Sequence, residues 1–104
     1  MMKNKRISPG ARATELTAVA LRLAREHGLA NLTRDQIASE AGVASGLVSL
    51  RLGTMPAMRR TVMRAAVTQG VLEVIAEGLA HRDPHAMAAP LELRQQASAL
   101  MAGV

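Results

Sequence analysis

The sequence predicts an all-α protein in which a three-helix head is followed by a short helical C-terminal region. In the first quarter of the chain, apolar residues repeat at helical spacing, namely Leu16, Val19, Ala20, Leu23 and Ala24. Residues 33–54 then carry the capping, glycine and apolar signals of two short helices. The chain is 49% hydrophobic but contains no Phe, Trp or Tyr. Its core must therefore use Leu, Val, Ile, Ala and Met, which favours closely packed helices over a sheet.

The first helix is expected over residues 11–27, where the apolar stripe faces the core. Its opposite face is charged and holds Arg12, Glu15, Arg22, Arg25 and Glu26. We expect Arg22 and Arg25 to be solvated surface charges. Gly28 is a natural end to this helix, and a short stretch then leads to Thr33.

Residues 33–54 predict two short helices joined by a tight turn, the arrangement of a DNA-binding helix-turn-helix. Thr33 can cap the first of these helices, and Gln36 can return the hydrogen bond in a capping box. Gly42 suits the left-handed conformation that ends this helix. Val43 is expected to fill the corner between the two helices.

The second helix of the pair, residues 45–52, is expected to enter the major groove of DNA. With Val48 and Leu52 turned inward, the opposite face is free to meet base edges. The expected base contacts are Ala44, Ser45, Gly46, Ser49 and Leu50. A serine hydroxyl can bond to any base and a leucine can pack on a thymine methyl. The alternative for Leu50 is packing against the neighbouring helix.

Over residues 12–60 the chain resembles the N-terminal domain of the TetR family of transcriptional repressors. The resemblance is carried by the ordered residues Leu32-Thr33, Ile37-Ala38 and Ala41-Gly42-Val43. It implies a DNA-binding repressor whose second short helix reads the operator. Two features depart from the family. The usual aromatic pair, a phosphate-contacting Tyr and a core Phe, is replaced by Ser49 and Leu52, and 104 residues are expected to lack the large effector-binding domain.

Phosphate contacts are expected around the same helices. The residues are Thr33, Arg34, Ser49, Arg51, Arg59, Arg60, Lys3, Lys5 and Arg6. The first two begin a helix whose N–H groups point toward phosphate. The next four are implied by the family resemblance, and the last three would form a flexible arm on the backbone or minor groove. The alternative for Arg51 is an exposed charge near the helix end.

The second half of the chain predicts further helices. Residues 54–69 form a fourth helix with Thr54 as cap, and Gly70 interrupts its pattern. Asp83 can cap a short turn or helix, and a last helix is expected over residues 90–101. The chain thus divides into a flexible basic arm (1–10), a helix-turn-helix DNA-binding domain (11–55), and a helical linker and dimerisation region (56–104).

Dimerisation is expected from an excess of apolar residues in the C-terminal region. The expected interface residues are Val71, Leu72, Ile75, Leu79, Leu91, Leu93 and Leu100. These are more than two short helices can bury against a three-helix head, and a large exposed apolar patch indicates an interface. The alternative is that residues 85–101 fold back and complete a monomeric core.

Charge supports the same division of labour. Residues 1–64 hold eleven Lys or Arg against four acids, whereas residues 65–104 hold two against four. A basic half with a helix-turn-helix is expected to meet phosphate, and the weakly acidic half is expected to meet protein.

Other kinds of chemistry find little support in the sequence. The absence of Cys excludes disulfides, thiol catalysis and Cys-ligated metal sites. Pro84 interrupts the spacing of His81, Asp83 and His85, so we expect no metal site. No nucleophile arrangement, carboxylate pair or Gly-rich phosphate loop is present, and we expect neither a cofactor nor an enzyme. No stretch approaches the ~20 apolar residues of a membrane span. We therefore expect a cytoplasmic protein without a membrane partner.

These observations predict a homodimeric transcriptional repressor that binds an inverted-repeat operator. Control is then expected from protein concentration, autoregulation or a second regulatory protein. Two alternatives remain at this level. One is a protein-interaction module that keeps the helix-turn-helix as a scaffold, and the other is an accessory factor that binds DNA without repressing.

Overall fold

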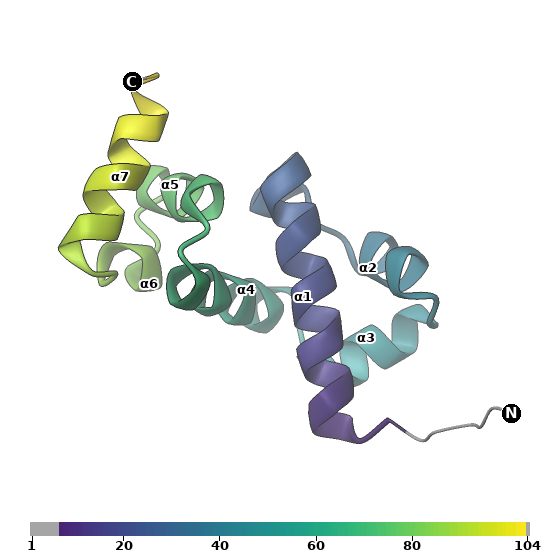
Figure 1. Ribbon diagram of the computed structural model, residues 1–104. Coiled ribbons are helices and arrows are strands. Elements are labelled where there is room, and N and C mark those ends of the chain that lie inside the picture. The colour runs from purple at the N-terminus through teal and green to yellow at the C-terminus, as the bar shows by residue number, and fades with distance from the viewer. Residues whose placement is uncertain (1–6, 104) are drawn as a thin grey trace, which may run out of the picture.

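The computed structural model describes residues 7–103, which are all-helical as predicted (Figure 1). Its elements are α1 (Pro9–His27), the 3₁₀-helix η1 (Leu29–Asn31), α2 (Arg34–Ala41), α3 (Ser45–Leu52), α4 (Met55–Gln69), α5 (Leu72–Ala80), α6 (Pro84–Met87) and α7 (Leu91–Met101). Within the described range there is no strand. No helix in that range combines the length and the apolar character that crossing a membrane requires.

Side-chain caps fix where the helices begin. Thr33 and Gln36 form the predicted capping box, with Gln36 N donating to Thr33 Oγ1 at 3.1 Å and Thr33 N to Gln36 Oε1 at 3.0 Å. Asp83 Oδ1 accepts from two backbone N–H groups at the start of α6. Ser8 caps α1 and Pro9 occupies its first turn. The helix therefore begins two residues before the predicted boundary, and Pro9 and Gly10 belong to it rather than to an arm.

The three-helix head has its core where α1 meets α2 and α3. Leu16, Ile37 and Val48 come from these three helices and are fully buried. In Figure 1 the head lies at one end of the molecule and α5–α7 at the other, with α4 between them. The helix α4 packs against α1 on one side and against α5 and α6 on the other. A single core therefore runs from the head into the C-terminal region, which we call the body (residues 72–101).

The body buries more of its apolar residues than the sequence suggested. Ile75 is fully buried inside the protomer, and its assignment to a dimer interface is wrong because it offers no surface to a partner. Val71, Leu72, Leu79 and Leu93 are half-buried against the same core. The reason is that α4, which buries Met63 and Ala66, packs against α5 and α6 within the same protomer.

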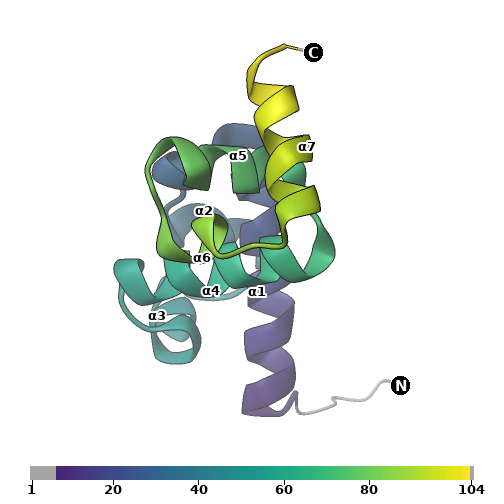
Figure 2. The same cartoon turned by 90° about the vertical axis from the view of Figure 1, so that its left-hand side faces the viewer.

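The helix α7 folds back onto α5, as Figure 2 shows from the body end of the molecule. It buries Ala97 completely and Leu93 in part. This is the packing described by the monomeric alternative. Of the expected interface residues, Leu91 and Leu100 stay clearly exposed, at 58% and 45%.

Two carboxylates of α5 tie the body to the head. Glu77 accepts hydrogen bonds from Leu29 N at 2.6 Å and from Ala30 N at 2.8 Å, at the start of η1. One turn earlier, Glu73 lies 3.2 Å from the guanidinium of Arg25. The pKa of Glu73 is lowered by a hydrogen bond from its own backbone N–H and by Arg25. This carboxylate therefore stabilises the fold above its unfolded pKa, and the contribution is lost as the pH falls through the folded pKa.

Gly78 is required by the close approach of α4, α5 and α6. A Cβ at this position would lie 2.5 Å from Met63 Cε and 2.7 Å from Ala86 Cβ. The Met63 side chain can move, but the Ala86 Cβ is fixed to its backbone. Gly78 therefore sets the distance between α5 and α6, although glycine is otherwise unfavourable inside a helix.

We expect Gly78→Ala to lower the free energy of unfolding by about 1–2 kcal/mol, because overpacking outweighs the gain in helix propensity. Gly46→Ala is the matched control, since a Cβ at this helical glycine meets nothing within 4 Å. The control is expected to be neutral or stabilising by about 0.5 kcal/mol. Urea denaturation measures both, and equal effects of the two substitutions would contradict the packing argument.

Candidate nucleic-acid interface

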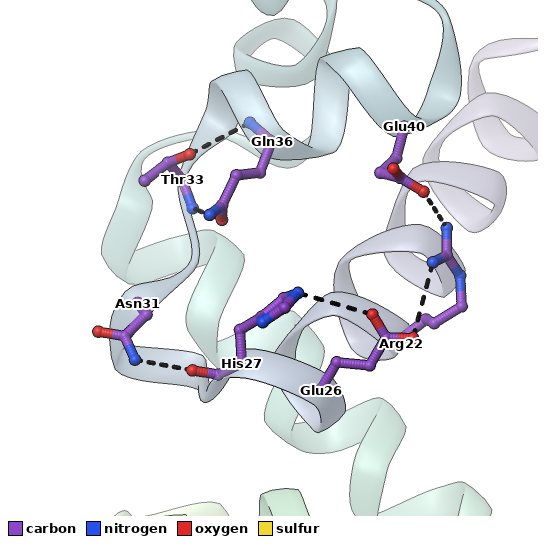
Figure 3. Close-up of polar contacts among 7 residues, drawn as sticks. All are labelled: Arg22, Glu26, His27, Asn31, Thr33, Gln36 and Glu40. Carbon is purple, nitrogen blue, oxygen red and sulfur yellow. Dashed lines mark hydrogen bonds and ion pairs between the residues drawn. The ribbon is translucent and has the colours of Figure 1, made fainter.

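The position of α2 is fixed by polar contacts with the end of α1, as Figure 3 shows. Arg22 donates to Glu40 of α2 at 2.8 Å and lies 3.9 Å from Glu26 on its own helix. The hydrogen bond to Glu40 is the main reason that the pKa of Arg22 is raised. Arg22 is therefore exposed to solvent, as expected, and it also links α1 to α2 through Glu40.

The turn between α2 and α3 has the predicted geometry. Gly42 adopts the left-handed conformation with φ 70°, and Val43 N donates to Ala38 O at 3.0 Å. Val43 packs against the core at the corner. Val48 and Leu52 are buried, so the opposite face of α3 is turned away from the protein.

An open groove of about 600 Å³ lies beside that face. Its walls come from η1, the first turn of α2, the start of α3 and the start of α4. The lining residues are Ala30, Asn31, Leu32, Thr33, Arg34, Asp35, Ser45, Gly46, Ser49, Met55 and Arg59. The groove therefore brings together six of the predicted contact residues from three helices, together with the positive end of the α2 dipole.

The remaining predicted base contacts lie outside the groove but on the surface. Ala44 is exposed, and Leu50 is exposed to 68%. Packing of Leu50 against a neighbouring helix, the alternative for this residue, is therefore wrong.

Ser45, inside the groove, is half-buried, and its hydroxyl donates to Asp35 Oδ1 at 2.6 Å. Asp35 was not among the predicted contact residues, and no local pattern in the sequence marks it as one.

The arginines of α1 differ in their ion pairs from those predicted to contact phosphate. Those of α1 lie within 4 Å of carboxylates, with Arg12 beside Glu15, Arg22 beside Glu40, and Arg25 beside Glu73. Among residues 7–103, no ion pair involves the predicted phosphate contacts, namely Arg34, Arg51, Arg59 and Arg60. Arg12 and Arg25 thus also have carboxylate partners, whereas the predicted phosphate contacts of the helix-turn-helix and of α4 have no ion pair among residues 7–103.

Two of these arginines also lack hydrogen-bond partners where a partner is needed. The Nε atoms of Arg34 and Arg51 are buried and have no acceptor within the described part of the chain. Because buried donors are ordinarily satisfied, these two Nε atoms leave the polar contacts of Arg34 and Arg51 incomplete within residues 7–103. Arg34 lines the groove, whereas Arg51 and Arg60 do not. Lys3, Lys5 and Arg6 lie outside the described residues.

Comparison with known proteins agrees with this geometry. A family model described as bacterial regulatory proteins, tetR family, matches residues 16–55. The matched segment begins at the buried Leu16 of α1, contains both short helices and their turn, and ends at the first residue of α4. No curated protein and no solved structure matches the chain. Residues 16–55 therefore form a helix-turn-helix DNA-binding domain of the TetR family.

Proposed function

We propose that the chain is a non-enzymatic transcriptional repressor that acts in the cytoplasm as a homodimer on an inverted-repeat operator. The observation that carries this proposal is the groove beside the exposed face of α3, which is lined by Arg34 and Arg59, two arginines with no ion pair among residues 7–103. Repression then needs no chemistry, because a protein seated on a promoter blocks access to it.

The exposed face of α3 is suited to close approach to base edges. Ala44 and Gly46 are small and exposed, so the helix backbone can lie deep in the major groove. Leu50 extends from the same face and offers an apolar contact for a thymine methyl. Ser45 and Ser49 contribute short polar groups between them. This face supports sequence reading through a few small contacts.

The groove wall is suited to a phosphate of the DNA backbone. The N-terminus of α2, the positive end of its dipole, and the residues Arg34 and Arg59 line the same space. Contacts of this kind fix the protein's position on the duplex but carry no sequence information. Two protomers would place their α3 helices in successive major grooves about 34 Å apart, which requires an inverted repeat.

The proposal is tested by binding of the full chain to the DNA upstream of its own gene. A gel shift with this DNA, competed by unrelated duplex, is expected to show a sequence-specific complex. A specific complex without reduced transcription from the bound promoter would favour the accessory-factor alternative. The absence of any DNA binding would favour the scaffold alternative and refute the proposal.

Replacing single arginines measures the phosphate contacts directly. Arg34→Ala and Arg51→Ala are each expected to weaken binding to all duplexes and to reduce the slope of log K against log salt by about one. Arg12→Ala is the matched control, because this arginine pairs with Glu15 within α1. The control is expected to leave the slope nearly unchanged. Equal slopes for all three variants would contradict the assignment of Arg34 and Arg51.

A further inference from the structure

The contact between Asp35 and Ser45 bears on which base the groove accepts. Asp35 lies in the first turn of α2 and Ser45 is the first residue of α3, so the pair bridges the two helices of the DNA-binding motif. Ser45 Oγ donates to Asp35 Oδ1 at 2.6 Å. Both residues line the groove beside the base-reading face. A distance of this length is typical of a hydroxyl bonded to an ionised carboxylate.

This hydrogen bond restricts what Ser45 can offer to DNA. A serine hydroxyl has one proton and two lone pairs, and ordinarily either donates or accepts. Here the proton is committed to Asp35, so the hydroxyl oxygen faces the groove only as an acceptor. The ionised carboxylate of Asp35 is also purely an acceptor. Together the two side chains therefore offer DNA only hydrogen-bond acceptors and no donor.

Bases differ in whether they can donate a hydrogen bond to such a pair of acceptors in the major groove. Adenine N6 and cytosine N4 carry amino hydrogens, whereas guanine O6 and thymine O4 are acceptors. We propose, on the basis of the function proposed above, that the Asp35–Ser45 pair selects an amino-bearing base, adenine or cytosine, at one position of each half-site. Guanine and thymine are disfavoured there because their oxygens meet oxygens.

The charge of Asp35 also limits binding to other DNA. It is an exposed carboxylate in the groove that Arg34 and Arg59 line. Near a phosphate its charge opposes the sequence-independent attraction, and its cost is offset only where an amino group of the correct base is in reach. The pair therefore favours the correct base at its position and also weakens binding to unrelated DNA.

The test is selection of binding sites by the full chain from duplexes with randomised half-sites, together with affinity for a random duplex. The wild type is expected to prefer adenine or cytosine by about tenfold at one position, the scale of one base-edge contact. Asp35→Ala and Ser45→Ala are both expected to reduce this preference to less than about threefold at that same position. Asp35→Asn is expected to admit guanine or thymine, because its amide frees the serine proton and adds donors.

Matched controls separate the pair from general charge and from folding. Glu92→Gln removes one negative charge from the exposed start of α7, and Ser98→Ala removes an exposed hydroxyl from the same helix. Both should keep the wild-type selection profile. The Asp35 variants, and not Glu92→Gln, should bind random duplex several-fold more tightly. Circular dichroism verifies that each variant retains its helices.

The outcomes distinguish this inference from the proposed function. An unchanged profile in Asp35→Ala or in Ser45→Ala overturns the pair, because one side chain then acts without the other. A wild-type preference for guanine or thymine at the affected position also overturns it. A wild-type chain that selects no sequence at all instead refutes the proposed function, on which this inference rests.

Discussion

Replacing Glu77 with alanine is expected to lower the free energy of unfolding by about 2–3 kcal/mol. The carboxylate accepts from Leu29 N and Ala30 N, and both bonds join the body to the head. Hydrogen bonds to a charged group each contribute about 1.5–3 kcal/mol. The buried Leu29 would be left with an unpaired N–H, whereas the exposed Ala30 can bond to water. A loss of this size is a large part of the stability of a chain this short.

Urea denaturation of three variants tests the expectation. Glu77→Gln retains one acceptor oxygen without the charge and should lie between the wild type and Glu77→Ala. Glu92→Ala is the control, because this exposed residue has no ion pair within residues 7–103 and should change stability by less than about 0.5 kcal/mol. Equal stability of Glu77→Ala and Glu92→Ala would show that the two bonds do not hold the body to the head.

The head was predictable from sequence because its signals are local. Thr33 and Gln36 are three positions apart and identify the start of α2, and Gly42 identifies its end. Val48 follows from the helical period of α3, which begins at Ser45, shortly after this glycine. Each of these residues acts within a few positions of itself, so pattern and capping rules were sufficient to place it.

The body was less predictable because its contacts are distant in sequence. Glu77 bonds to Ala30 across 47 positions, and no local pattern links the two. Ile75 shows a second limit. Helical periodicity indicates that such a residue is buried but not which surface covers it, and here α5 packs against α4, α6 and α7 of the same chain. The predicted dimer interface therefore included residues that the protomer itself buries.

The candidate site falls between these cases. The groove-lining residues of α2 and α3 were mostly identified, since the turn between the two helices determines how they face each other. Asp35 was missed because its partner, Ser45, lies ten positions away on the other side of that turn. The sequence showed Asp35 as one of two acids in the motif, and the hydrogen bond that gives it a role requires the folded geometry.

Exposed leucines of α7 remain the residues through which two copies are proposed to associate. Leu91 lies at the start of the helix and Leu100 near its end, and Met101 of α7 and Met87 of α6 are also exposed. Met87, Leu91, Leu100 and Met101, all exposed, make α6 and α7 the candidate interface. A self-complementary two-fold contact is the commonest way in which such a surface is covered. The proposed dimer therefore uses α7 and not the buried Ile75.

The double variant Leu91→Glu/Leu100→Glu is expected to be a folded monomer that binds an inverted repeat at least about 100-fold more weakly. Joining two half-site contacts through one dimer makes the second contact intramolecular, and this advantage is lost when the protomers separate. Binding to a single half-site should be unchanged, because the substitutions are far from α3 (Figure 1). Ile75→Glu cannot replace this variant, since a charge buried at that position would unfold the protomer.

Light scattering at micromolar concentration measures the oligomeric state, and binding to full and half operators measures the affinity for DNA. The wild type should have a mass near twice the 11.0 kDa of one chain, and the double variant a mass near one chain. Ala80→Glu, a charge added at an exposed site of α5, is the control and should remain dimeric. A wild-type mass near 11.0 kDa with full affinity for the inverted repeat would rule out the dimer. One protomer would then supply all the contacts that the operator needs, and the exposed leucines would require a different partner.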